Sequence, residues 1–175
     1  MPEEMYKLPM PSNSLYGKVS SISGVLKKKD ASGQIHELLI NDEVFMGESV
    51  LADATSAALI NYENLASIRL GGDCELDISD SSKESLLIWH RRGECVFEAK
   101  RETILSIRSL QAVFEVKSGS LKITMDDTSS KLSINASGSS VIMAYQDLDH
   151  NSYVTKVDEN QQLVYFNRTR MLLKN

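Results

Sequence analysis

Apolar and polar residues alternate along most of the chain with a period close to two. This period is typical of β-strands with one buried face, because successive side chains of a strand point to opposite faces of the sheet. No proline occurs after Pro11, which fits a backbone whose amides are widely used in sheet hydrogen bonds. The apolar positions of the first half are Val19, Ile22, Val25, Leu26, Ile35, Leu38, Ile40, Val50, Ala58, Ile60, Ile68, Leu70, Leu76 and Ile78.

A polar segment at residues 80–85 ends this first half, and alternation resumes at Leu86. The second half contains short apolar segments at residues 86–89, 96–99, 104–107, 112–116, 121–125, 132–134, 141–145, 153–157 and 163–166. We therefore predict an all-β domain of stacked short antiparallel strands, either a twisted sandwich or a β-solenoid-like pile, in two similar halves at about 15–79 and 86–175. Residues 1–14 hold all three prolines and are expected to be a disordered lead-in or linker, so that a single domain spans 15–175.

Length and charge narrow the classes of function. A chain of 175 residues is long enough to bury a core of its own as one domain. Its 24 acidic and 19 basic residues give a formal charge of -5, and the basic residues are scattered, so no nucleic-acid surface is predicted. No apolar run approaches the roughly 18 residues that span a bilayer, and residues 1–6 lack the parts of an export signal. We expect no direct membrane insertion of the chain as given.

Turn residues punctuate the predicted strands at nearly even spacing. The ones we expect to build structural turns are Asn41, Asp42, Gly47, Gly71, Gly72 and Gly93. The order of elements from Gly17 to Ile78 resembles the FecR-like domain of bacterial envelope proteins and the related retention module of large surface adhesins. Residues 87–97 and 157–163 resemble the opening and the close of the second half of that pattern. Two positions depart from it, since Asn41 stands where the family usually has Gly and Ala52 where it usually has Thr.

The resemblance implies a non-catalytic protein–protein interaction module of a bacterial cell-envelope protein, acting in signal sensing, relay or anchoring. It implies protein partners in the envelope and a periplasmic or cell-surface location, with no cofactor. Exposed strand edges are natural pairing sites for a strand of another chain. Two alternatives stay open: a surface or secreted ligand-binding module, such as an adhesin part or a carbohydrate binder, and a structural subunit of an envelope assembly. The sequence also leaves a homo-oligomer open.

Candidate catalytic and metal-binding residues do not form a recognisable motif. His36, His90 and His150 lie in three different polar contexts without a second ligand at metal-binding spacing, and no nucleophile elbow or phosphate loop occurs. We therefore expect no enzyme, no catalytic residue and no metal site. Residues 147–158 place oxygen donors as a calcium loop does, but Ser152 stands in place of the bending glycine. We expect a solvated β-turn there.

Three further features have structural interpretations. Alternation places Cys74 and Cys95 on inward faces of neighbouring segments, which leaves open a disulfide or two free buried thiols. Trp89 is the single tryptophan and is expected in the core. Lys27, Lys28 and Lys29 are expected to form a solvated hairpin rim.

Overall fold

The computed structural model describes residues 14–100, 104–126, 128 and 130–174, and every regular element in them is a β-strand, which confirms the predicted fold class. The strands are β1 (Gly17–Ser23), β2 (Leu26–Lys29), β3 (Ile35–Glu37), β4 (Glu43–Val44), β5 (Ser49–Ala52), β6 (Ala57–Tyr62), β7 (Ala66–Leu70), β8 (Glu75–Ser81), β9 (Ser85–Ala99), β10 (Ile104–Ser109), β11 (Ala112–Val116), β12 (Gly119–Asp126), β13 (Lys131–Ser137), β14 (Val141–Gln146), β15 (Ser152–Val157), β16 (Gln162–Phe166) and β17 (Met171–Lys174).

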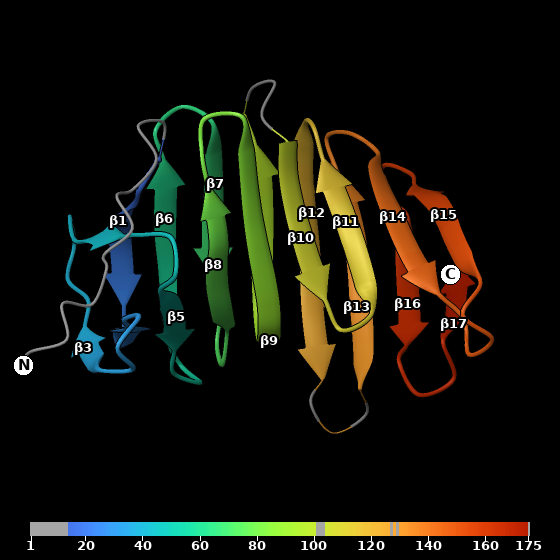
Figure 1. Ribbon diagram of the computed structural model, residues 1–175, viewed down its shortest axis with the longest axis horizontal. Helices are drawn as coiled ribbons and strands as arrows, with labels where there is room; N and C mark the ends of the chain where they lie inside the picture. Colours follow the sequence, from blue (N-terminus) through green and yellow to red (C-terminus); the bar gives the residue numbers. More distant parts are fainter. Residues whose placement is uncertain (1–13, 101–103, 127, 129, 175) are drawn as a thin grey trace, which may run out of the picture.

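These strands form two layers that share β9. Sheet 1 has the order β3-β2-β5-β8-β9-β10-β11-β14-β15. Sheet 2 has the order β4-β1-β6-β7-β9-β12-β13-β16-β17. All of these pairings are antiparallel except β9 with β10. Figure 1 shows the strands arranged along the long axis of the molecule, with the N-terminal strands at one end, β9 near the middle and the C-terminal strands at the other end.

The second half of the chain builds this pile by adding one hairpin at a time. The hairpin β10–β11 lies in sheet 1, β12–β13 in sheet 2, β14–β15 in sheet 1 and β16–β17 in sheet 2. Each hairpin pairs with the previous hairpin of its own sheet, through β11 with β14 and through β13 with β16. The architecture is therefore a long two-layer sandwich in which successive hairpins are added along one axis, alternately to one sheet and the other, as in a solenoid. The chain crosses between the layers in the connections at the rims.

Strand β9 passes from one sheet to the other at a bend. Residues 85–90 and Arg92 pair within sheet 1, whereas residues 93–99 pair within sheet 2. Buried positions are even-numbered up to His90 and odd-numbered from Cys95, so the alternation changes phase at the bend. Gly93 has φ of +78°, and a Cβ there would lie 2.4 Å from the carbonyl of Asp73. The backbone adopts this close approach because glycine has no side chain.

The bend corrects one expectation from the sequence. Gly93 was predicted to be a structural turn between two strands, but the chain does not reverse there and β9 continues for 15 residues. Because β9 pairs with β8 and β7 on one side and with β10 and β12 on the other, the two halves of the domain share this strand. Residues 82–84, within the predicted junction, form the short connection from β8 to β9.

The core lies between the inner faces of the two sheets and contains large fully buried side chains such as Tyr62, Phe97 and Phe114. Trp89 was expected among them, but it lies on the outer face of sheet 1 and is only partly buried. Its ring is covered by the guanidinium of Arg91, whose Cζ lies 3.3 Å from the ring centre. Tryptophan gains this cation–π contact because its ring face carries negative electrostatic potential.

The described part of the predicted lead-in is Ser14, which forms a β-bridge with Ser82. The adjoining Leu15 is buried, and its amide donates to the carbonyl of Ser81. The folded body therefore includes Ser14, and the rest of the predicted lead-in lies outside the described residues.

Candidate functional site

The predicted turn residues of the first half form turns that hold the start of the sandwich. Asn41 has φ of +76°, a conformation that asparagine tolerates better than most residues. Asp42 follows it, and its Oδ2 accepts a hydrogen bond from the amide of Leu39 at 2.8 Å. Gly47 has φ of +86°, and its amide donates to the carbonyl of Ile78. The backbone at Asn41 thus explains how asparagine can stand where the resembled family usually has glycine.

Gly71 and Gly72 lie in the connection between β7 and β8, although the positive φ of this turn falls on Asp73, at +55°. The amide of Gly71 donates to the carbonyl of Glu94. A Cβ on Gly72 would lie 2.1 Å from the carbonyl oxygen of Ala54, so this glycine permits close packing of two backbone segments. Both glycines have structural roles in this arrangement.

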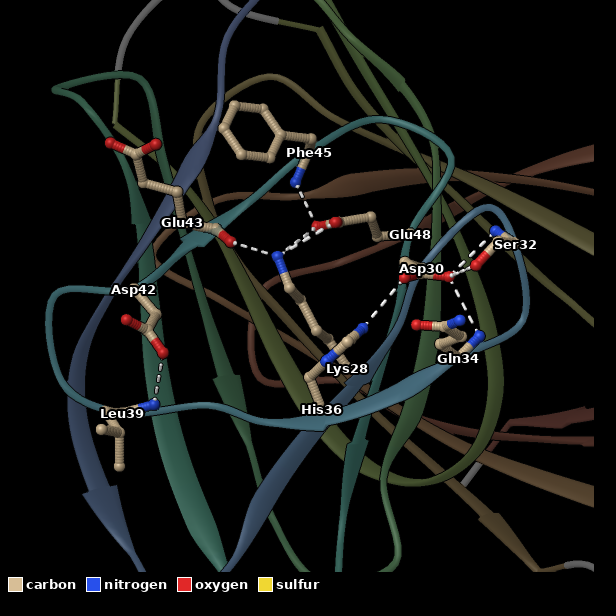
Figure 2. A network of polar contacts seen from close by, with 10 residues as sticks. All are labelled: Lys28, Asp30, Ser32, Gln34, His36, Leu39, Asp42, Glu43, Phe45 and Glu48. Carbon is tan, nitrogen blue, oxygen red and sulfur yellow. Dashed lines mark hydrogen bonds and ion pairs between the residues drawn. The ribbon is translucent and has the colours of Figure 1, made fainter. Parts of the chain in front are cut away.

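A largely buried ion pair joins β2 to the connection between β4 and β5 at the same end of the molecule (Figure 2). Lys28 of β2 donates to Glu48 at 3.0 Å and to the backbone carbonyl of Glu43 at 3.1 Å. The carboxylate of Glu48 also accepts from the amide of Phe45 at 2.8 Å. Lys28 was expected on a solvated hairpin rim, but its ammonium group is instead paired with Glu48 and the carbonyl of Glu43. The central lysine of the basic run is therefore paired within the chain.

The hairpin between β2 and β3 is organised by the carboxylate of Asp30 (Figure 2). Its Oδ1 accepts from the hydroxyl of Ser32 at 2.6 Å and from the amides of Ser32 and Gln34. Its Oδ2 lies 2.9 Å from Nε2 of His36. The Ser32 hydroxyl and then His36 hold the pKa of Asp30 below its usual range, because both favour the charged carboxylate. His36 thus completes an exposed turn.

The second histidine belongs to the core. His90 is fully buried in β9, and its Nε2 donates to the carbonyl of Gly93 at 3.1 Å. Because a carbonyl only accepts, Nδ1 is the acceptor for the hydroxyl of Ser109, at 2.9 Å. Burial lowers the pKa of His90 to about 4. The sequence placed His90 in a polar context, and the structure corrects this: both ring nitrogens are satisfied inside the sandwich.

Cys74 and Cys95 form a disulfide beside His90, with their Cα atoms 6.5 Å apart. The bond connects the loop before β8 to β9, close to the bend. Within the described part of the chain, the ligand atoms of Cys74, His90 and Cys95 lie within 4.8 Å of one another. Two joined sulfurs offer no thiolate, and a thiolate is the form of cysteine that binds zinc. In this oxidation state the cluster serves as a cross-link in the core.

The segment that resembled a calcium loop forms a compact turn and an edge strand. Oδ1 of Asp147 accepts from the amides of Asp149 and Asn151, each at 2.9 Å. Its Oδ2 accepts from the side chain of Asn151 and from the hydroxyl of Tyr153, each at 3.0 Å. Asp158 follows the whole of β15 and lies outside this turn. The carboxylate of Asp147 thus accepts four hydrogen bonds from residues 149–153, which fix the chain in a turn.

The histidines do not come together. His36 lies in the β2–β3 hairpin, His90 in the core, and His150 in the connection between β14 and β15 with φ of +64°. A shallow hollow of about 520 Å³ lies over β12, β13 and β16 and includes Lys122, Thr124 and Asn135 in its lining. These side chains offer hydrogen bonds and charge without a paired nucleophile and base.

Two strands at the C-terminal end of the sandwich have a free edge. In the described residues β15 pairs with β14 alone, and β17 pairs with β16 alone. At the other end the free edges belong to β3 and β4, which have three and two residues. Short edge strands offer few backbone groups to another chain. The six-residue strand β15 is therefore the longest free edge, and Figure 1 shows it at the far end of the molecule from β3.

The fold is shared with solved structures, although the sequence is not. No protein-family model matches the chain, and no curated protein matches it either. Two crystal structures, each of a candidate anti-sigma factor from Parabacteroides distasonis ATCC 8503, match with a TM-score of 0.62 at 15% and 14% sequence identity. Each match covers 73% of this chain and 58% of the other. The likeness shows a common fold over most of this chain, which spans little more than half the length of these neighbours.

No helix among the described residues is long and apolar enough to cross a membrane.

Proposed function

We propose that this chain is a non-catalytic protein-binding module of a bacterial signalling protein with a FecR-like role at the cell envelope. The observation that carries the proposal is the fold shared with candidate anti-sigma factors over 73% of the chain. A protein of that class acts by binding other proteins, and this chain presents surfaces suited to such binding. We place it in the periplasm or at the cell surface, in agreement with the family that the sequence resembles.

The free edge of β15 supports a binding role. An unpaired edge strand offers backbone N–H and C=O groups to a strand of a partner, which gives affinity without requiring particular side chains. The disulfide between Cys74 and Cys95 supports an envelope location, because such bonds persist mainly in oxidising compartments. Neither feature requires a cofactor or a reactive side chain.

The test is a transcription measurement in the bacterium that encodes the chain. Deleting its coding region should change the expression of a discrete set of genes that depend on one alternative sigma factor, and a plasmid copy should restore it. Unchanged transcription in the deletion strain would overturn the signalling role. Turnover of a substrate by the purified chain, lost in a variant that still folds, would overturn the non-catalytic one.

A further inference from the structure

On the outer face of sheet 1 in the second half, exposed apolar side chains are interspersed with polar ones in two rows that run across five strands. The first row, across β9, β10, β11, β14 and β15, consists of Leu87, Ser106, Glu115, Ile142 and Lys156. The second row consists of Trp89, Arg108, Val113, Ala144 and Val154. We call six of these residues the outer patch: Leu87, Arg108, Val113, Ile142, Ala144 and Val154.

The apolar members of the outer patch face solvent. The exposed fraction is 73% for Val154, 44% for Val113 and 40% for Ile142. A hollow of about 310 Å³ lies over Val113, Ala144 and Val154, where the small side chain of Ala144 separates two valines. The outer face of sheet 2 differs, because its central positions there are polar, as at Lys122, Thr124, Ser133 and Asn135. Both outer faces are formed by antiparallel hairpins, so the difference between them lies in their side chains.

Arg108 gives the outer patch a positive charge without an internal counter-ion. Its guanidinium contacts the ring of Trp89, with Cζ 4.6 Å from the ring centre, and no carboxylate among the described residues lies within ion-pair distance of it. The other charges in the two rows have partners, Glu115 with Lys117 at 3.0 Å and Lys156 with Asp158 at 3.5 Å. A complementary surface would therefore carry a carboxylate beside apolar side chains.

The size of the outer patch indicates a short occupant. Five strands about 4.8 Å apart span about 19 Å, and the two rows lie about 7 Å apart along the strands. The resulting area is a few hundred Å² at most, well below the roughly 800 Å² that each partner buries in a stable complex of two globular proteins. A single helix of about 13 residues is about 20 Å long and about 10 Å across, which fits these dimensions. The area thus favours one helical segment over a second copy of the chain.

We propose that the outer patch binds an amphipathic helix of another protein that places apolar side chains on Val113, Ile142, Ala144 and Val154 and a carboxylate on Arg108. An apolar side chain of the helix enters the hollow above Ala144. This assignment rests on the proposed function, because it names the surface through which the module meets its partner. The outer patch is a different surface from the free edge of β15, which would pair with an extended strand of a partner.

The single tryptophan supplies the measurement. Trp89 lies next to Arg108 in the same row, so its fluorescence should report a ligand at the outer patch. The probes are two synthetic 14-residue peptides with the same leucine stripe at helical spacing, one with glutamates flanking the stripe and one with lysines at those positions. We expect a saturable change in Trp89 emission with the acidic peptide, and at least fivefold weaker binding of the basic peptide.

Variants locate the site. Arg108→Glu should reverse the preference between the two peptides, and Val154→Asp should weaken binding of the acidic peptide at least fivefold. The matched control is Arg69→Glu, because Arg69 is an exposed arginine on a central strand of sheet 2 and the change in charge is the same. It should bind like the parent chain. Circular dichroism and melting temperature establish that each variant is folded, and Val154→Asp, at a mostly exposed position, tests the patch without removing a contact of Trp89.

Three results would overturn the assignment: no saturable emission change, equal binding of both peptides, or the same loss in Arg69→Glu as in Arg108→Glu. A dimer in sedimentation experiments that Val154→Asp dissociates would also overturn it, in favour of self-association. Complementation of the deletion strain distinguishes the two proposals. If Arg108→Glu and Arg69→Glu both restore transcription, the signalling role stands and the outer patch is not its contact surface. If the peptides bind but the deletion has no effect, the patch stands and the signalling role fails.

Discussion

The disulfide between Cys74 and Cys95 should account for a substantial part of the stability of this domain. The bond joins residues 21 apart in sequence. A cross-link that closes a loop of this length removes about 11 cal/mol/K of entropy from the unfolded chain, which corresponds to about 3 kcal/mol at 25 °C. For a domain of this size, about 3 kcal/mol corresponds to a decrease in melting temperature of roughly 6 to 12 °C. We expect that loss when the bond is reduced.

Urea unfolding of the parent chain with and without a phosphine reductant measures the effect, and a thiol titration confirms that two thiols appear on reduction. The double variant Cys74→Ala/Cys95→Ala is the control, since it lacks the bond in both conditions and the reductant should leave its unfolding curve unchanged. If the reduced parent chain unfolds at the same urea concentration as the oxidised one, the cross-link does not restrict the unfolded state as the loop length requires. Two free thiols in the untreated protein would refute the bond itself.

Further variants test the turns, the buried histidine and the largely buried ion pair. Gly47→Ala introduces backbone strain alone, because nothing lies within 4 Å of the added Cβ, and should cost about 1 kcal/mol in urea unfolding. Gly93→Ala adds a clash with backbone atoms 2.4 Å away and should cost at least about 2 kcal/mol, so equal losses would contradict the close approach at the bend. Burial holds the pKa of His90 at about 4, below the ordinary value of 6.5, so the unfolded chain takes up a proton that the folded chain refuses. The free energy of unfolding should therefore be highest above pH 6.5 and fall by about 3 kcal/mol as the pH is lowered towards 4. In His90→Gln this decrease with pH should be smaller. The same decrease in the variant as in the parent chain would exclude His90 as its source. Lys28→Ala leaves the carboxylate of Glu48 largely buried without its cation and should cost about 2 kcal/mol, whereas Lys29→Ala at an exposed position should change stability by less than about 0.5 kcal/mol. Similar losses in both lysine variants would show that the pair with Glu48 contributes little.

Local patterns in the sequence predicted the fold class well, since each strand shows its buried face through its own residues. The alternation in β12, for example, gives Leu121, Ile123 and Met125 to the core and their neighbours to solvent. The turn at Asn41 is equally local, because asparagine accepts a positive φ with little strain. The same alternation placed Cys74 and Cys95 inward, but could not decide between two thiols and a bond, which depends on a Cα separation across strands.

The candidate surfaces required the tertiary structure. Trp89 alternates with buried neighbours in the sequence, and only the pairing of β9 with β8 and β10 shows that it lies on an outer face. His90 lies on the same inward face of β9 as Leu86 and Ile88, whereas the glycine that permits β9 to change sheets just after it resembles an ordinary turn signal in the sequence. A glycine specifies that the backbone can adopt an unusual angle, but not where the following strand will pair.

The sequence by itself determined that the chain forms short strands with one apolar face and where most of them turn, because these properties depend on residues close together in the chain. The tertiary structure alone decided that β9 joins the two sheets, that two cysteines meet, and that Arg108 lies among exposed valines from β11 and β15. These arrangements depend on contacts between residues far apart in sequence, and strand order and register set them. A period of two specifies which face of a strand is buried, but not which strands become its neighbours.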